Sequence, residues 1–269
     1  MRFLFALSLT SVVTVLAQSR GRCIERPVPS VLKANVTTQI FDLGGARSQA
    51  SNFTVDTYIH VITTSAKKNK YPRATIDKQM AALNKAYKPY KFQFTLKGLD
   101  YTTAYKKKLR KGTYRTLNIY LLSDLNGLLG IAEFPVAAPS AAQKVLDGVV
   151  AWAETVPGGK AKRKEGPYNL GYTAVHEAGH WLGLLHTFSQ PQDGSQPSCD
   201  DKGDFVSDTP AQLTPTEGCP ASKDTCPTKS GKDPINNYMD CSTNNCYTQF
   251  TAGQTTRMVY NYAQYRDGK

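Results

Sequence analysis

The stretch AVHEAGHWLGLLHTF, residues 174–188, decides the fold and holds three of the four histidines in this chain of 269 residues. In a helix, His176 and His180 are four residues apart, so they differ by only about 40° around the axis and lie on one face. Both imidazoles can therefore reach one ion. Gly183 permits the positive φ that ends a helix, after which His186 can approach the ion from another side.

Three imidazoles suit zinc and leave its fourth tetrahedral position open to water, which is the arrangement of a catalytic zinc. Glu177 follows the first ligand and is placed to act on that water as a general base. A histidine pair on a helix is often only a hydrogen-bonded surface feature. The extended spacing HExxHxxGxxH, however, arises by chance in about one in 10⁵ chains of this length. The residues therefore predict a zinc site with His176, His180 and His186 as metal ligands and Glu177 as the catalytic residue.

The amino terminus, MRFLFALSLTSVVTVLA, places one arginine before an apolar run and ends on small residues. This pattern predicts a secretory signal peptide at residues 1–17. A membrane anchor is the alternative, but the run is shorter than the roughly 20 apolar residues that span a bilayer. Sequons at Asn35 and Asn52 predict glycosylation and agree with export. We expect a secreted, extracellular protein with no membrane association.

Six cysteines follow the signal segment, and five of them lie within residues 199–246. An even number of cysteines in a secreted chain predicts disulfides. The segment is rich in Pro, Gly, Ser, Thr and Asp, so we expect bridges rather than regular helix or sheet to hold it. Its aspartates could also supply hard oxygen ligands for calcium, although no EF-hand spacing is present and a solvated acidic loop is the alternative. The four candidates are Asp200, Asp201, Asp204 and Asp208.

The chain is basic, with 33 Lys and Arg against 21 Asp and Glu and a formal net charge of +12. Residues 65–115 alone hold fifteen Lys and Arg against Asp77 and Asp100. The run shows no finger or RNP pattern, and lysines on a helix usually form a solvated face. We therefore expect no nucleic-acid partner.

An alternating pattern at residues 55–64, two runs rich in aromatic or branched residues and a run closed by PGG place four strands before the histidine motif, and no internal repeat is present. One amphipathic helix is expected at residues 75–87, and a second, beginning near Leu170, carries the histidines. The predicted class is α+β, a twisted sheet with two main helices followed by a loop-rich, disulfide-held lobe. We assign residues 18–54 to an N-terminal extension and residues 55–269 to the catalytic domain. The strands are expected at residues 55–64, 91–98, 114–122 and 146–156.

HExxHxxGxxH with a later methionine in a tight turn is the metzincin signature, and the later methionine is Met239 in NNYMDC. The segments HWLGLLHTF, GDFVSDTP, GCP, NYMD and FTAGQTTRM further resemble the pappalysin family, in particular small secreted fungal metalloproteases. The likeness runs from about Tyr58 to Tyr262. It implies a metzincin zincin-like fold and a monomeric zinc endopeptidase acting on extracellular proteins or peptides. It also implies that Met239 lies beneath the metal.

The resemblance implies two interleaved disulfides, Cys199–Cys226 and Cys219–Cys246, and leaves Cys23 and Cys241 as a third pair. A free Cys23 that caps the zinc of a silent zymogen, as in other metzincins, is the alternative.

One position departs from the family pattern. Relatives carry a tyrosine two residues after the methionine, placed to stabilise the oxyanion, whereas this chain has Cys241. That role is therefore not implied here, and Tyr238 and Tyr247 are the nearby phenols. A catalytically silent zinc-binding interaction module is the competing function, and Glu177 favours the enzyme because a silent relative has little need of this carboxylate. An exported basic protein that binds acidic polymers is a third hypothesis, which the histidine motif does not support.

Overall fold

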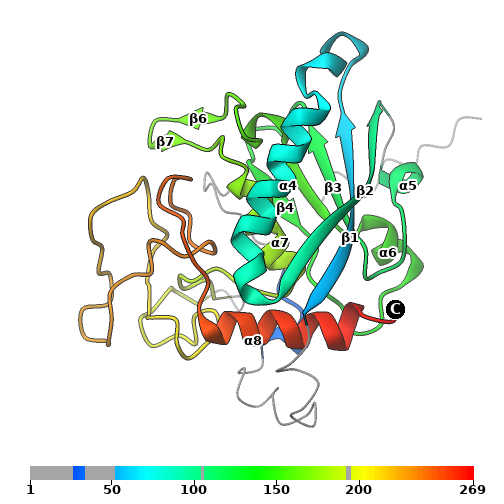
Figure 1. Cartoon of the computed structure of the whole chain (residues 1–269). Helices are drawn as coiled ribbons and strands as arrows, with labels where there is room; N and C mark the ends of the chain where they lie inside the picture. Colours follow the sequence, from blue (N-terminus) through cyan, green and yellow to red (C-terminus); the bar gives the residue numbers. More distant parts are fainter. Residues whose placement is uncertain (1–26, 34–51, 104–105, 192–194) are drawn as a thin grey trace, which may run out of the picture.

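The computed structural model describes residues 27–33, 52–103, 106–191 and 195–269, and a five-stranded sheet lies at its centre (Figure 1). The strand order is β2-β1-β3-β5-β4, with β4 alone running antiparallel, at the edge beside β5. The four predicted strands are present with shifted ends. The edge strand β4 was not predicted because three residues are too few to show alternation. The bounds are β1 (Phe53–Ile62), β2 (Phe92–Thr102), β3 (Leu117–Leu122), β4 (Gly130–Ala132) and β5 (Val149–Trp152).

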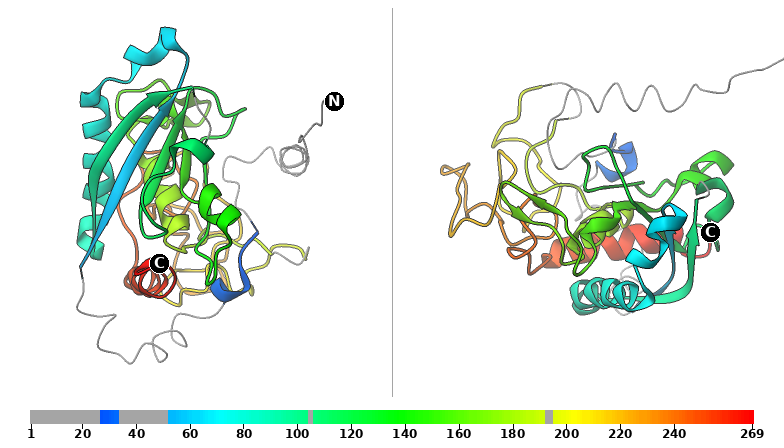
Figure 2. Two further views of the ribbon diagram at one scale, coloured as in Figure 1. Left: turned by 90° about the vertical axis from the view of Figure 1, so that its right-hand side faces the viewer. Right: turned by 90° about the horizontal axis from the view of Figure 1, so that it is seen from above.

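The two faces of the sheet bury different side chains. Ile119 and Leu121 of β3 face the main core, whereas Tyr120 lies in a separate cluster on the other face, as the two-residue period of a strand requires. Helices α4 (Arg73–Tyr87) and α7 (Tyr172–Trp181) pack against the main-core face and against each other (Figures 1 and 2). The expected sheet with two main helices is confirmed.

A buried ionic cluster positions the end of α7. The carboxylate of Asp147 accepts hydrogen bonds from Trp181 Nε1 at 3.2 Å and from Arg266 Nη1 at 3.1 Å, and it pairs with Arg110 at 3.2 Å. The guanidinium of Arg266 also stacks 3.8 Å from the Trp181 ring. A buried carboxylate is tolerated when cations and donors satisfy it this fully. The cluster thereby fixes the helix that carries the histidines.

Residues 182–251 form the loop-rich lobe, in which no helix or extended strand is assigned among the described residues. Helix α8 (Ala252–Asn261) closes it, starting at a capping box of Thr251 and Gln254. The sequence did not predict α8, because its glycine and threonines are poor helix formers and only Met258 and Val259 of this helix enter the main core. Short elements complete the chain: α5 (Lys106–Leu109), α6 (Ala141–Leu146), β6 (Lys162–Arg163) and β7 (Gly166–Pro167).

Two disulfides brace the loop-rich lobe, Cys199–Cys226 and Cys219–Cys246, with Cα–Cα distances of 5.6 and 5.3 Å. This interleaved pairing is the one that the resemblance implied. The buried carboxylate of Asp240 adds hydrogen bonds from the backbone of Thr216 at 3.0 Å and from the side chain of Gln212 at 3.1 Å. Such bonds replace the ladders of a sheet, so the loops keep their backbone groups satisfied.

Three predictions fall outside the described residues, namely the signal peptide at residues 1–17, the pairing of Cys23 and the sequon at Asn35. Asn52 is exposed, one residue before β1, so its sequon is accessible. Residues 27–33, which lie in the expected N-terminal extension, pack against later parts of the chain, where Val28 and Leu32 join Leu185 in a buried cluster. Within the described ranges, no helix is both long and apolar enough to cross a membrane.

Candidate metal centre

The three motif histidines meet in one buried cluster. Their Nε2 atoms lie 3.1 Å (His176 to His186), 3.2 Å (His176 to His180) and 3.2 Å (His180 to His186) apart. Ligands at about 2.0–2.1 Å from a tetrahedral zinc are separated by about 3.3 Å, so the three atoms fit one such ion. In the part of the chain that the structure describes, no other group of three His, Cys, Asp or Glu side chains is arranged to hold a metal.

The outward nitrogen of each ring has its own acceptor. A bond from Nδ1–H to a fixed oxygen sets the tautomer and leaves the lone pair of Nε2 facing the centre of the cluster. The bonds run from His176 to the backbone oxygen of Tyr238 at 2.7 Å, from His180 to that of Leu184 at 2.8 Å, and from His186 to Oε1 of Gln190 at 2.7 Å.

Burial keeps these imidazoles neutral. Desolvation lowers the pKa of His176 to about 4 and that of His186 to about 3. It also places the pKa of His180 well below its usual value, and the two neighbouring histidines add to this effect. Neutral imidazole is the form that binds metals, so the cluster is ready for an ion at neutral pH.

The turn after α7 explains how the third histidine reaches the first two. Gly183 has φ +89°, and its amide donates to the carbonyl of His180 at 2.8 Å. A Cβ atom at this position would lie 2.2 Å from Nδ2 of Asn261. Glycine is therefore required both by the backbone conformation and by the lack of space.

Met239 lies directly against α7 between the first two histidines. Its side chain is fully buried, and a Cβ atom on Gly179 would stand only 2.4 Å from Met239 Sδ. The backbone amide of Thr187 donates to the carbonyl of Met239 at 3.3 Å, which links this turn to the segment that bears His186. The methionine turn thus touches both parts of the histidine cluster.

The side chain of Glu177 extends from α7 toward the edge strand β4. Its side chain is buried, and a Cβ atom on Gly130 would approach Oε1 to 2.7 Å, so glycine in β4 makes room for the carboxylate. Glu177 lines a small cavity together with His176, Tyr172 and Cys241. The carboxylate therefore borders both the metal cluster and an opening beside it.

The phenol groups near Cys241 have other tasks. Tyr247 donates its hydroxyl proton to the carbonyl of Asp240 at 2.6 Å, beneath the methionine turn. Tyr238 is buried among aromatic rings, and desolvation raises the pKa of its hydroxyl. No cysteine in the described part of the chain is free, and Cys241 is disulfide-bonded. Tyr247 and Cys241 nevertheless line the small cavity that Glu177 and His176 border.

The four aspartates considered for calcium point to different partners. Each carboxylate is engaged separately: Asp200 with Lys229, Asp201 with Ser189 and Ser198, Asp204 with Val206, and Asp208 with Thr251 and Gly253. No three of them converge as a group that could hold an ion, within the ranges that the structure covers. The described structure gives no support to calcium at these residues.

Sequence reasoning missed the residues that support the site. Gly179 carried a signal, because an isolated glycine inside a helix pattern often has a packing reason. Gln190 and Gly130 carried none, since their importance depends on neighbours that come together only in the fold. The fourth histidine, His60, lies in β1 and bonds Asp100 at 3.0 Å, apart from the cluster.

The sheet, the paired helices and the three-histidine cluster above a methionine turn define a metalloendopeptidase of the metzincin class. The chain belongs to the Peptidase_M43 family, described as pregnancy-associated plasma protein-A, whose family model matches residues 113–263. Membership of this family implies a bound metal, and the histidine cluster is the site that fits it.

Individual relatives agree with this assignment. An extracellular metalloprotease of Pyricularia oryzae is 42% identical over 287 residues, covering 99% of this chain and 97% of the relative. One from Neurospora crassa is 45% identical over 236 residues, covering 82% and 79%. Among solved structures, mature mirolysin of Tannerella forsythia in complex with a cleaved peptide superposes with a TM-score of 0.65 at 26% identity, covering 80% of this chain and 97% of mirolysin.

Proposed function

We propose that this protein is a secreted zinc endopeptidase that hydrolyses peptide bonds in extracellular proteins, with Glu177 as the general base. The observation that carries the proposal is the convergence of three neutral imidazoles, whose Nε2 atoms are 3.1–3.2 Å apart. The buried carboxylate of Glu177 lies beside them, on the helix that carries His176 and His180. In this proposal His176, His180 and His186 hold the zinc. Met239 supports them from below.

The chemistry needs no covalent enzyme intermediate. When bound, zinc lowers the pKa of a coordinated water to about 7 and polarises the scissile carbonyl. Glu177 takes a proton from the attacking water and later delivers it to the leaving amine as the C–N bond breaks. Because Glu177 touches β4 at Gly130, a peptide laid along this edge strand passes within reach of its carboxylate.

Export and substrate class follow from two sources. The relatives are named extracellular metalloproteases, and the first 17 residues have the pattern of a secretory signal. We therefore propose extracellular proteins or peptides as substrates of a monomeric enzyme. A catalytically silent zinc-binding module remains the competing function, and the buried position of Glu177 beside the cluster favours the enzyme.

The variant Glu177→Gln separates these functions. It should retain about one zinc per chain but lose proteolysis by about 10²-fold or more, because general-base catalysis contributes about 10²–10⁴-fold. Glu217→Gln, at an exposed carboxylate in the loop-rich lobe, is the matched control and should match the wild type. Elemental analysis and turnover of a quenched peptide are the two measurements. A loss of only a few-fold in Glu177→Gln would assign the proton transfer to another group.

A further inference from the structure

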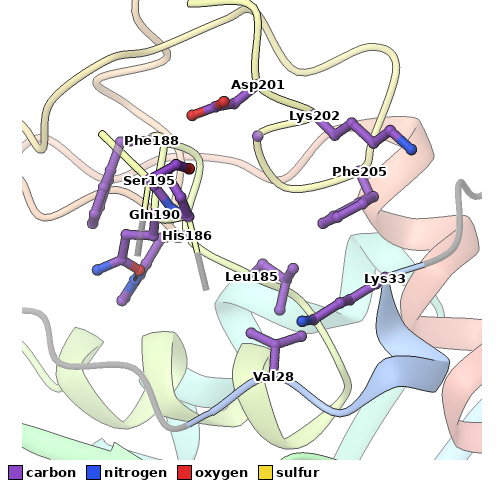
Figure 3. A pocket seen from close by; sticks show the side chains of 12 residues that line it. Val28, Lys33, Leu185, His186, Phe188, Gln190, Ser195, Asp201, Lys202 and Phe205 are labelled. Atoms are coloured by element: carbon purple, nitrogen blue, oxygen red, sulfur yellow. Dashed lines mark hydrogen bonds between the residues drawn. The ribbon is translucent and has the colours of Figure 1, made fainter. Parts of the chain in front are cut away.

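A second cavity borders the metal centre at His186 (Figure 3). It has a volume of about 250 Å³ and is lined by His186 together with Val28, Leu185 and Phe205. We call it the His186-side cavity. The histidine cluster therefore borders two cavities, one lined by His176 and Glu177 and one lined by His186.

The N-terminal segment builds part of this cavity. Leu32 is completely buried, and the guanidinium of Arg257 donates both to the carbonyl of Leu32 and, at 2.8 Å, to that of Gly183. One buried cation thus ties residues 27–33 to the turn that directs the third histidine. Val28 and Lys33 are held in place beside the metal centre as a result.

The cavity combines an apolar wall with two ammonium groups, those of Lys33 and Lys202, and one carboxylate, that of Asp201. The side chain of Lys202 points away from Leu185 (Figure 3). Val28, Leu185 and Phe205 supply the wall, and the side chain of Lys33 points across the cavity toward Leu185 (Figure 3). Among the ion pairs that join described residues, none includes Lys33. Asp201, on the far side of the cavity, is already bonded to Ser198 at 2.9 Å. With two lysines and one aspartate in its lining, the cavity has an excess of one positive charge.

We propose that the His186-side cavity is a subsite for an acidic side chain of the peptide substrate. This inference rests on the proposed function, because it places the peptide across the metal. A volume of about 250 Å³ is below the roughly 300–1,000 Å³ of pockets that enclose whole small molecules, so it suits a single side chain. Glutamate fits best, since its methylenes meet the apolar wall while its carboxylate reaches Lys33.

The test uses the zinc-loaded full chain and peptides that differ at one position. Glu, Gln and Lys are placed in turn at each position flanking the scissile bond, and kcat/KM is measured. At one position Glu should exceed Gln by about tenfold, the size expected for a hydrogen bond to a charged group. Lys33→Glu should reverse the preference to Lys, and Lys33→Met should remove it. Lys78→Glu, at an exposed lysine of α4, is the control and should keep the wild-type preference.

Binding supplies a readout that does not depend on turnover. The same peptides are titrated into zinc-loaded Glu177→Gln, with and without Lys33→Glu, by calorimetry. Reversal of the charge preference in binding supports the subsite even if the wild type cleaves no peptide. Absence of cleavage would contradict only the proposed function. Normal cleavage with the same preference in wild type, Lys33→Glu and Lys33→Met would overturn the subsite and leave the proposed function intact.

Discussion

The contact between Gly179 and Met239 gives a quantitative test of how the methionine turn supports the metal ligands. In Gly179→Ala, the new methyl group would lie 2.4 Å from Met239 Sδ and 3.2 Å from its Cε. Comfortable contacts between heavy atoms are about 3.5–4.0 Å, so the methionine must move by about 1 Å. Met239 is completely buried, so it cannot turn out into solvent. The change therefore overpacks the core directly beneath the histidines.

The expected change in the free energy of unfolding is the sum of two opposing effects. Overpacking a core costs about 1–3 kcal/mol, whereas replacing glycine by alanine inside a helix contributes about 0.8–1 kcal/mol of stability. Because 2.4 Å is a severe overlap, we expect a net loss of about 2 kcal/mol in the free energy of unfolding. The residue before Met239 supplies the carbonyl that holds His176 at 2.7 Å, so displacement should also weaken zinc binding by about tenfold.

Two assays on the same protein check both numbers. Urea unfolding of the metal-free protein gives the free energy, and competition with a chelator gives the zinc Kd. Repeating Gly179→Ala in a Met239→Ala background removes the overlap, so the substitution should become stabilising by about 1 kcal/mol through helix propensity alone. An equal cost in both backgrounds would refute the packing argument and place the strain elsewhere in α7.

Two further outcomes follow from the contacts of the histidines. Gln190→Ala removes the acceptor of His186 Nδ1 and should weaken zinc binding by about 10–100-fold in chelator competition, whereas Gln93→Ala at an exposed position should not; an unchanged Kd would contradict the role of Gln190. In the metal-free protein, the folded state lowers the pKa of His176 to about 4 and that of His186 to about 3, whereas both titrate near 6.5 when the chain is unfolded. The unfolded chain therefore binds protons first, so the free energy of unfolding is highest above pH 6.5 and falls as the pH drops toward 4. At pH 5, each of these two histidines should lower the free energy of unfolding by about 2 kcal/mol relative to neutral pH. His186→Asn should therefore weaken the pH dependence of the free energy of unfolding measured in urea.

The strands and the motif helix were accessible from sequence because their signals are local. The 3.6-residue period places His176 and His180 on one face, and a glycine three residues later marks the end of the helix. Alternation within β1 and β3 likewise reports the two faces of a strand. The same signal fails for β4, which is only three residues long, and for α8, whose Gly253, Thr255 and Thr256 are poor helix formers. The core, not intrinsic propensity, stabilises these two elements.

What the sequence by itself determined is therefore the class of the protein, because the donors of the metal cluster lie within eleven residues and their spacing is set by one helix and one turn. The tertiary structure decided everything that joins distant segments. It brings the carbonyl of Tyr238 to His176 across 62 residues of chain, and the carbonyl of Leu32 to Arg257 across 225. It also separates the aspartates that sequence placed together. Contacts of this kind carry no local periodicity, since they form only when the burial of the whole core offsets the conformational entropy of ordering the chain.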